Sequence, residues 1–231
     1  MIVQRSKRLA LIKDYVLKHK DVKITELNQV IDASESTIRR DIKTLAQDGF
    51  LNELYGSVVL NVQNSPDTFF QERLNQNVSI KKDIGLKAAK TIKDQDVIYI
   101  DAGSTTFHMV EAIEAKDITV VTNSIHIAEN LANRHINTYI VPGNLKPLTM
   151  AIVGEQALEY VRTYNFDKCF MGTNGISKKG YSTPDVKEGI LKKAVINHSR
   201  ECFVLSDSSK ENVSTAYIFA SLERCTLIKN I

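Results

Sequence analysis

An apolar run at residues 97–100, Val-Ile-Tyr-Ile, leads directly into Asp-Ala-Gly-Ser-Thr-Thr at residues 101–106. This pattern predicts a buried strand, a tight turn at Gly103 and a helix that begins near Thr105. Backbone N–H groups at the start of such a helix, together with three neighbouring hydroxyls, favour an anion. The same residues also fit an ordinary capped turn, so this segment alone leaves both interpretations open.

The chain around this segment repeats the alternation of strand and helix. Short apolar runs alternate with helical stretches, which predicts βαβ units and a mostly parallel sheet with helices on both faces. Polar turns follow several runs, and the carboxyl ends of parallel strands gather at one edge where ligands bind. The strand-like runs are residues 97–100, 119–121, 139–141, 168–171, 203–205 and 226–228, and the polar turns are residues 122–124, 172–175 and 207–210.

The polar residues of this edge suit a phosphorylated ligand. A phosphate monoester attracts cations, for which Lys192 and Lys210 are candidates. Asp101 and Asp185 are expected to accept hydrogen bonds from sugar hydroxyls or to hold the loops. Glu188 lies four residues before Lys192 and could orient it, although a plain surface ion pair is the alternative. The candidate effector-binding residues are Asp101, Gly103, Ser104, Thr105, Thr106, Asn123, Asn174, Gly175, Asp185, Glu188, Lys192 and Lys210.

A polar segment separates this region from the first 60 residues. Residues 61–78 contain Pro66 and no sustained periodicity, which is typical of a linker. We therefore predict an N-terminal domain at residues 1–60, a linker at 61–78 and an α/β domain at 79–231.

The N-terminal domain has the pattern of a winged helix-turn-helix. Apolar spacing predicts a first helix over residues 3–19, Thr25 is the expected N-cap of a short second helix, and Ser34 that of a third, which ends before Gly49. Residues 50–60 predict two strands around a turn, which would form the wing.

The third predicted helix has a polar face opposite Ile38. This face combines hydroxyls near the helix start with cations that suit phosphates and guanine edges, as in a recognition helix in the major groove. The candidate DNA-binding residues are Ser36, Thr37, Arg39, Arg40 and Lys43. The alternative is an ordinary solvated helix face.

Residues 33–42, Ala-Ser-Glu-Ser-Thr-Ile-Arg-Arg-Asp-Ile, followed by the Gly56 wing, resemble the DeoR family of bacterial sugar-metabolism repressors. The resemblance continues through five ordered motifs of the second domain, at residues 101–106, 122–124, 174–175, 182–192 and 207–210. The sequence departs from the family pattern at Glu53 in the wing, at Gly189, where alanine is usual, and at Glu211. The resemblance implies a sensor domain similar to ribose-5-phosphate isomerase and a phosphosugar effector, with repressors of fructose-type phosphotransferase operons looking closest.

We therefore expect a repressor of a carbohydrate-utilisation operon that binds double-stranded operator DNA as a homodimer or higher homo-oligomer and responds to a phosphorylated sugar, fructose phosphate being the first candidate. The alternative is an isomerase- or deaminase-like enzyme acting on a sugar phosphate, with a DNA-binding domain attached.

The composition of the sequence limits which other classes of protein it can belong to. With 43% hydrophobic and 25% charged residues and a formal charge of +3, the 231-residue chain has the composition of a packed globular protein. We expect no membrane segment and a cytoplasmic location, since no apolar run approaches the ~18 residues of a span. The sequence contains no zinc or nucleotide motif, and we expect neither metal nor cofactor. Cys169, Cys202 and Cys225 lie in apolar runs and are expected to be buried free thiols.

Overall fold

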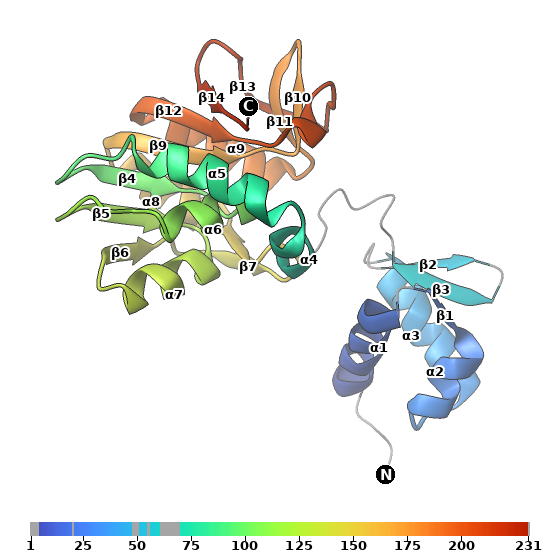
Figure 1. Cartoon of the computed structure of the whole chain (residues 1–231). Coiled ribbons are helices and arrows are strands. Elements are labelled where there is room, and N and C mark those ends of the chain that lie inside the picture. Colours follow the sequence, from blue (N-terminus) through green and yellow to red (C-terminus); the bar gives the residue numbers. More distant parts are fainter. Residues whose placement is uncertain (1–4, 20, 48–50, 55, 61–69, 231) are drawn as a thin grey trace. The chain divides into compact units, whose positions relative to one another are not determined.

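The computed structural model describes residues 5–19, 21–47, 51–54, 56–60 and 70–230 (Figure 1). The chain divides into two compact units, Met1–Pro66 and Asp67–Ile231. Among the described residues, no helix has both the length and the apolar composition needed to cross a membrane.

The N-terminal unit is a winged helix-turn-helix. Two antiparallel strands form the wing, as predicted, and a third short strand pairs with β3 only, which gives the order β1-β3-β2. The core includes Ile12, Val16, Ile38, Ile42 and Leu45, all at most 1% exposed. The elements are α1 (Arg5–His19), β1 (Asp21–Lys23), α2 (Ile24–Val30), α3 (Glu35–Gln47), β2 (Leu51–Leu54) and β3 (Ser57–Leu60).

One predicted cap is wrong and one is confirmed. Helix α2 begins at Ile24 with Lys23 in the N-cap position, so Thr25 lies inside the helix and does not cap it. The side chain of Glu26 accepts a hydrogen bond from the Lys23 N–H at 3.4 Å, which satisfies a donor at this helix start without a hydroxyl. Ser34 precedes α3, and its Oγ accepts from the Thr37 N–H at 3.3 Å.

The second unit is built on a six-stranded sheet in which every pairing is parallel. The six predicted apolar runs are its six strands, in the order β14-β12-β9-β4-β5-β6. In chain order this is a doubly wound sheet, and its direction of winding reverses between β4 and β9. The strands are β4 (Val97–Ile100), β5 (Thr119–Thr122), β6 (Asn137–Ile140), β9 (Phe166–Gly172), β12 (Ser199–Leu205) and β14 (Thr226–Ile228).

Helices cover both faces of this sheet, as predicted (Figure 1). Ile98 and Ile100 of β4 belong to the core on one face, whereas Tyr99, which points the opposite way, belongs to the core on the other. The first face is covered by α5 (Val78–Ala89), α6 (Ser104–Val110) and α7 (Ile125–Asn133), and the second by α8 (Glu155–Arg162) and α9 (Val186–Asn197).

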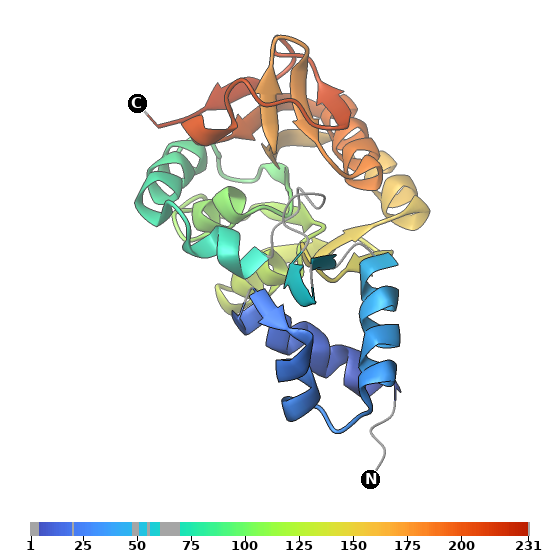
Figure 2. The same ribbon diagram turned by 90° about the vertical axis from the view of Figure 1, so that its right-hand side faces the viewer.

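Smaller elements surround the carboxyl edge. An antiparallel sheet in the order β10-β11-β13 stands beyond the main sheet, in orange and red at the top of Figure 2, and β7 pairs with β8 as a hairpin. These elements were not predicted from the sequence. They are β7 (Asn144–Lys146), β8 (Ala151–Val153), β10 (Gly175–Ser177), β11 (Gly180–Thr183), β13 (Tyr217–Ala220) and the 3₁₀ turn η1 (Ser208–Lys210).

Part of the predicted linker is regular structure. Residues 61–69 lie outside the described part of the chain, but Phe70–Asn75 form helix α4. The Phe70 side chain is 2% exposed and its ring stacks on that of His126 at 4.6 Å between centroids. The predicted linker at 61–78 therefore includes a short helix, which a buried aromatic anchors and which is too short to show periodicity in the sequence.

The cysteines are buried free thiols, as predicted. Cys169 and Cys202 are direct neighbours across β9 and β12.

Candidate functional site

The candidate effector site lies where β4 and β9 end, the point at which the sheet reverses its winding. Ligands of doubly wound sheets bind in the crevice at this position. The Gly172 N–H donates to Asp101 Oδ2 at 3.1 Å, and the Asp101 N–H donates to the Phe170 carbonyl at 3.0 Å, so the two strand ends are tied together. The motifs at residues 101–106 and 172–175 therefore meet at one edge of the sheet.

Lys192 of α9 is compensated within the chain. Its ammonium pairs with the Asp101 carboxylate and donates to the Gly172 carbonyl at 3.1 Å. Both members of the pair are buried, Lys192 at 4% and Asp101 at 3% exposed. Lys192 thus faces the edge as half of a neutral pair, which suits sugar hydroxyls better than it suits a phosphate dianion.

Two predictions were made for Glu188 and Lys192, that Glu188 orients the lysine or that the two form a surface ion pair, and both are wrong. Glu188 Oε1 instead accepts from Lys146 Nζ at 2.7 Å and from Thr149 Oγ1 at 3.1 Å. Glu188 and Lys192 are both buried, so a surface ion pair is excluded too. Lys192 has the nearer carboxylate of Asp101, which comes from a distant part of the sequence.

Asp185 holds the start of α9. Its Oδ1 accepts from the Glu188 N–H at 2.8 Å, and Lys146 lies 3.0 Å from its Oδ2. Burial would raise the pKa of Asp185, but the hydrogen bonds from Glu188 and Lys146 outweigh burial and lower this pKa below its usual value. Lys146 and Thr149 were missed because residues 144–149 carry neither periodicity nor a motif.

The hydroxyl groups in the turn after β4 are of two kinds: one holds the turn, and two are not used within the chain's described residues. Thr106 Oγ1 lies 2.6 Å from the Asp101 carbonyl and 2.9 Å from the Gly103 carbonyl, so this hydroxyl holds the turn. Ser104 and Thr105 are 7% and 9% exposed, and no hydrogen bond joins their hydroxyls to another described residue. These two hydroxyls are therefore available to a ligand.

The amides of the edge are framework groups. Asn123 Oδ1 accepts from the Ala102 N–H at 2.9 Å, and Asn174 Oδ1 accepts from Thr183 Oγ1 at 3.3 Å. Gly175 is required by space, since a Cβ there would lie 2.6 Å from the Val213 carbonyl oxygen.

Lys210 differs from the other predicted cation. It ends η1, directly after β12, where Asp207 Oδ1 accepts from the Ser209 N–H at 2.9 Å. Within the described part of the chain, no carboxylate lies at ion-pair distance from Lys210. Its charge therefore remains available to an anion.

Helix α3 presents the predicted DNA-binding face. Ser36, Arg40 and Lys43 are exposed, and neither cation forms an ion pair with a described residue. Thr37 is half-buried, and its hydroxyl bonds to Ser34 Oγ at 2.8 Å.

Arg39 is paired within the N-terminal unit. Its guanidinium lies 2.8 Å from Glu35 and 3.4 Å from Glu53 of the wing. Arg39 and Lys43 are like charges four residues apart on the helix, and these carboxylates offset their repulsion. A DNA contact by Arg39 would have to replace two exposed ion pairs.

The fold and the two polar surfaces define a class. A winged helix-turn-helix followed by a doubly wound domain with a polar carboxyl edge is the architecture of a ligand-responsive, DNA-binding regulator.

The chain belongs to the DeoR family. Residues 8–64 match the model described as the DeoR-like helix-turn-helix domain, and residues 76–229 match the DeoR C terminal sensor domain. This bears out the resemblance noted in the sequence, including the function as a sugar-sensing transcriptional regulator.

Curated relatives match over nearly their whole length. The chain is 39% identical to the uncharacterized HTH-type transcriptional regulator FruR of Bacillus subtilis, covering 96% of this chain and 89% of that protein. It is 32% identical to IolR of the same organism, covering 94% and 87%, and 28% identical to a lactose phosphotransferase system repressor of Staphylococcus epidermidis, covering 88% and 82%. These relatives are transcriptional regulators, so the alternative of an enzyme is not supported.

Solved structures with related folds include ribose 5-phosphate isomerase from Plasmodium falciparum, with a TM-score of 0.43, 20% identity and coverage of 58% of this chain and 52% of that one. The delta subunit of eIF2B from Chaetomium thermophilum has a TM-score of 0.51 at 14% identity, covering 96% and 72%. Likeness at this level concerns the fold and not the activity.

Proposed function

We propose that this regulator represses a carbohydrate-utilisation operon, and that a phosphorylated sugar binding at the carboxyl edge of β4 and β9 changes its affinity for operator DNA. Fructose phosphate is the first candidate effector. Because its partner is operator DNA, the protein would act in the cytoplasm.

The observation that carries this proposal is the division of groups at the edge. The compensated pair of Lys192 and Asp101 offers donors and acceptors to sugar hydroxyls, whereas the hydroxyls of Ser104 and Thr105 and the charge of Lys210 lack partners among the described residues. A ligand with a polyhydroxylated part and an anionic part satisfies both groups.

DNA recognition is assigned to Ser36, Thr37, Arg40 and Lys43, with Arg39 as a fifth contact if its ion pairs open. We propose a homodimer, since two recognition helices about 34 Å apart would read successive major grooves on one side of the duplex. An effector that favours one arrangement of the paired domains by 1–3 kcal/mol would change operator affinity roughly 5–150-fold.

The test is a thermal-shift screen of the full chain against sugar phosphates and their unphosphorylated parents. A ligand at 100 times its Kd adds about 2.7 kcal/mol, or roughly 5–10 °C in a domain of this size. We expect one phosphosugar to raise Tm while its parent does not. Absence of any shift across the panel would refute the proposed effector class.

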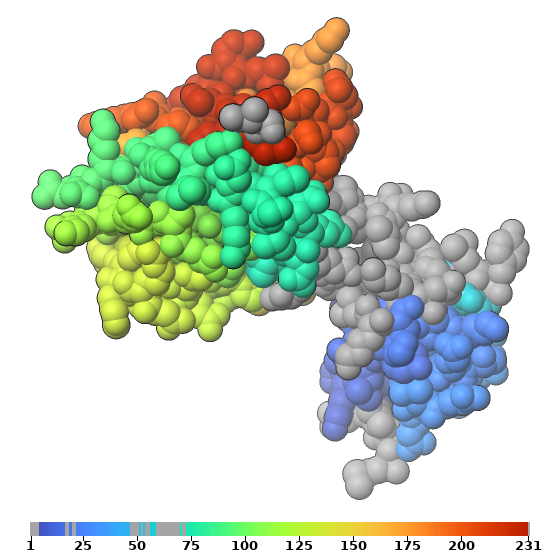
Figure 3. Space-filling model, in the orientation of Figure 1, coloured from blue at the N-terminus to red at the C-terminus, as the bar shows by residue number. Residues whose placement is uncertain are grey.

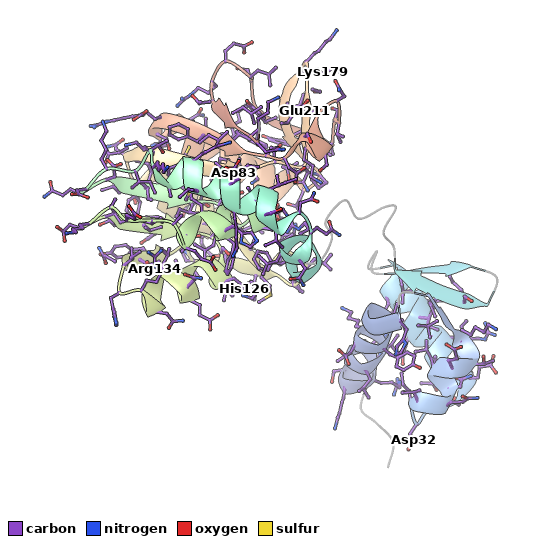
Figure 4. The ribbon with its side chains drawn as sticks, viewed as in Figure 1. Asp32, Asp83, His126, Arg134, Lys179 and Glu211 are labelled. Carbon is purple, nitrogen blue, oxygen red and sulfur yellow. The ribbon has the colours of Figure 1, made fainter. Side chains whose placement is uncertain are left out.

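A matched pair of variants localises the site. Lys210→Ala should abolish the shift, whereas Lys179→Ala should not, since Lys179 is an exposed cation that lies at the turn of the β10–β11 hairpin (Figure 4). An unchanged shift in Lys210→Ala would exclude Lys210 from the site.

A further inference from the structure

The outer surface of α8 and α9 carries apolar side chains where a solvated helix surface is usually polar. Val186 is 51% and Ile190 39% exposed, and the two lie one turn apart on α9. The partly buried Leu158 of α8 lies across from Ile190, and a hollow of about 460 Å³ separates the two helices there. We call the surface formed by Leu158, Val186 and Ile190 the α8–α9 face. Grouped apolar side chains on a surface mark a site of association.

Helix α9 carries residues of the candidate effector site on its other side. At 100° per residue, Glu188 and Lys192 each lie 200° from Ile190 around the helix, whereas Val186 lies within about 40° of it. Glu188 and Lys192 are buried and pair with residues of the sensor unit, as described above. One helix therefore presents the candidate effector site on one side and the α8–α9 face on the other.

Two opposite charges border the hollow. Glu155 is the first residue of α8 and Lys187 the second of α9, and both line the hollow beside Ile190. Neither residue forms an ion pair with another residue in the described part of the chain. The two helices lead into the neighbouring parallel strands β9 and β12, so they run in the same direction, side by side at the right of Figure 2. The α8–α9 face thus has an anion at the start of one helix and a cation at the start of the other.

This pattern of charge is complementary to a second copy of itself. In a two-fold dimer the same surface of both protomers meets, so each contact occurs twice. An axis that runs parallel to the helices places α8 of one protomer against α9 of the other. Glu155 then faces the partner's Lys187, and Lys187 faces the partner's Glu155. The partner's Val186 lies at the level of the hollow, which an apolar side chain can fill.

The place at which the chain enters the sensor unit favours the same axis. The ring of Phe70, the first residue of α4, stacks on that of His126 near the start of α7, and α7 follows the carboxyl end of β5. The chain therefore enters at the carboxyl edge of the sheet. An axis parallel to the helices is also nearly parallel to the strands, so both carboxyl edges lie on one side of the dimer. Both connections to the DNA-binding units then start from that side, as two recognition helices on one duplex require.

We propose that the α8–α9 face is the surface through which two copies of this chain form a dimer. This inference rests on the homodimer of the proposed function and names the surface that forms it. The exposed parts of Val186 and Ile190 supply apolar area to be buried, and the two pairs of Glu155 with Lys187 determine the relative orientation of the protomers. Because α9 also holds part of the candidate effector site, a ligand there contacts the helix that forms the interface.

Light scattering after gel filtration of the full chain tests the apolar part of the interface. The wild type should have twice the mass of the chain. Ile190→Asp should have the mass of one chain at the same concentration, because the carboxylate would be buried in the interface without a partner. Leu86→Asp is the matched control and should remain a dimer. Leu86 is 44% exposed on α5, which covers the opposite face of the sheet and forms the blue-green surface in Figure 3.

Charge reversal tests the orientation. Glu155→Lys and Lys187→Glu should each raise the Kd of the dimer about tenfold or more in low salt, since like charges then face each other twice. The double variant Glu155→Lys/Lys187→Glu exchanges the two charges and should bring the Kd back to within about threefold of the wild type. Sedimentation equilibrium measures these constants. A double variant that dimerises as weakly as the two single variants would overturn the proposed orientation.

The outcomes separate this inference from the proposed function. If the wild type is a dimer and Ile190→Asp is still a dimer, another surface forms the interface, so this inference is overturned and the homodimer stands. If the wild type is a single chain at micromolar concentration, the homodimer fails and this inference fails with it. The effector is tested separately, by the thermal-shift screen.

A measurement on the unaltered protein covers the case in which the variants do not fold. A dimer is assembled from isotopically light and heavy chains and treated with a carbodiimide, which joins a carboxylate to an amine in contact with it. Mass spectrometry should find Glu155 joined to Lys187 in peptide pairs that contain one light and one heavy chain. Links between these residues only within light or only within heavy pairs would overturn the proposed contact.

Discussion

Replacing Lys192 by methionine should sharply destabilise the sensor domain. Its ammonium pairs with Asp101, and both groups are at most 4% exposed. Without Lys192 the Asp101 carboxylate keeps the hydrogen bond from the Gly172 N–H at 3.1 Å, its one remaining side-chain hydrogen bond among the described residues. Removing one partner of a buried pair costs about 3–5 kcal/mol, because the other charge is left without compensation.

In a unit of the size of Asp67–Ile231, this loss corresponds to a fall in Tm of roughly 6–20 °C. Differential scanning calorimetry of Lys192→Met measures it, with Lys193→Met as the control, since Lys193 is the exposed neighbour. Adding Asp101→Asn to Lys192→Met should recover at least half of the loss, because the orphaned charge is then removed. A fall below about 2 °C, or no recovery in the double variant, would refute the reasoning.

Three further predictions concern other parts of the chain. Arg40→Ala should weaken operator binding by ~1–3 kcal/mol and relax sequence preference at one position, whereas Lys43→Ala should weaken all sequences alike, as fluorescence anisotropy with labelled DNA would show. Gly189→Ala should cost about 1–3 kcal/mol, because a Cβ would lie 2.2 Å from Cδ1 of Tyr217, and Tyr217→Ser in the same chain should relieve the loss in urea unfolding. Asp185→Ala should cost ~1–2 kcal/mol at pH 7 through loss of the α9 cap. Because the pKa of Asp185 is lowered, its contribution is complete above about pH 4 and disappears as the pH falls through that lowered value, so the wild type and the Asp185→Ala variant should converge in acid.

The sheet was predictable because its strands are local signals. Each of the six parallel strands overlaps a short apolar run, and the inner strands, which are covered on both faces, are the most continuously apolar, whereas the edge strand β6 is largely exposed. The β7–β8 hairpin and the sheet of β10, β11 and β13 were not predictable in the same way. They lie at the periphery of the domain, where exposed positions such as Leu145 and Ile218 interrupt alternation.

The candidate site was predictable in its members but not in its pairings. Motif and strand end placed Asp101 and Lys192 at one edge, but the contact between them joins residues 91 positions apart. The helical spacing of Glu188 and Lys192 suggested a local pair, and the three-dimensional alternatives proved closer. Local spacing predicts which side chains share a helix face, whereas partners from other strands decide which of them pair.

Gly189 shows how a departure from a family pattern acquires a physical reason. The sequence alone gave no explanation for glycine where alanine is usual. In the structure the ring of Tyr217 on β13 occupies the space that an alanine Cβ would need. The glycine therefore accommodates a contact between α9 and the small antiparallel sheet.

The distribution of charge at the carboxyl edge explains why the effector should be a phosphosugar and not a neutral sugar. Lys192 and Lys146 are paired with carboxylates, so neither lysine requires an anionic ligand to neutralise its charge. Lys210, which ends η1, has no carboxylate at ion-pair distance among the described residues, and we expect the anionic part of the effector to bind there. Since a ligand shifts an equilibrium only by its differential affinity for the two states, we expect the effector to change DNA affinity only if the carboxyl edge binds it differently in the two arrangements of the paired domains.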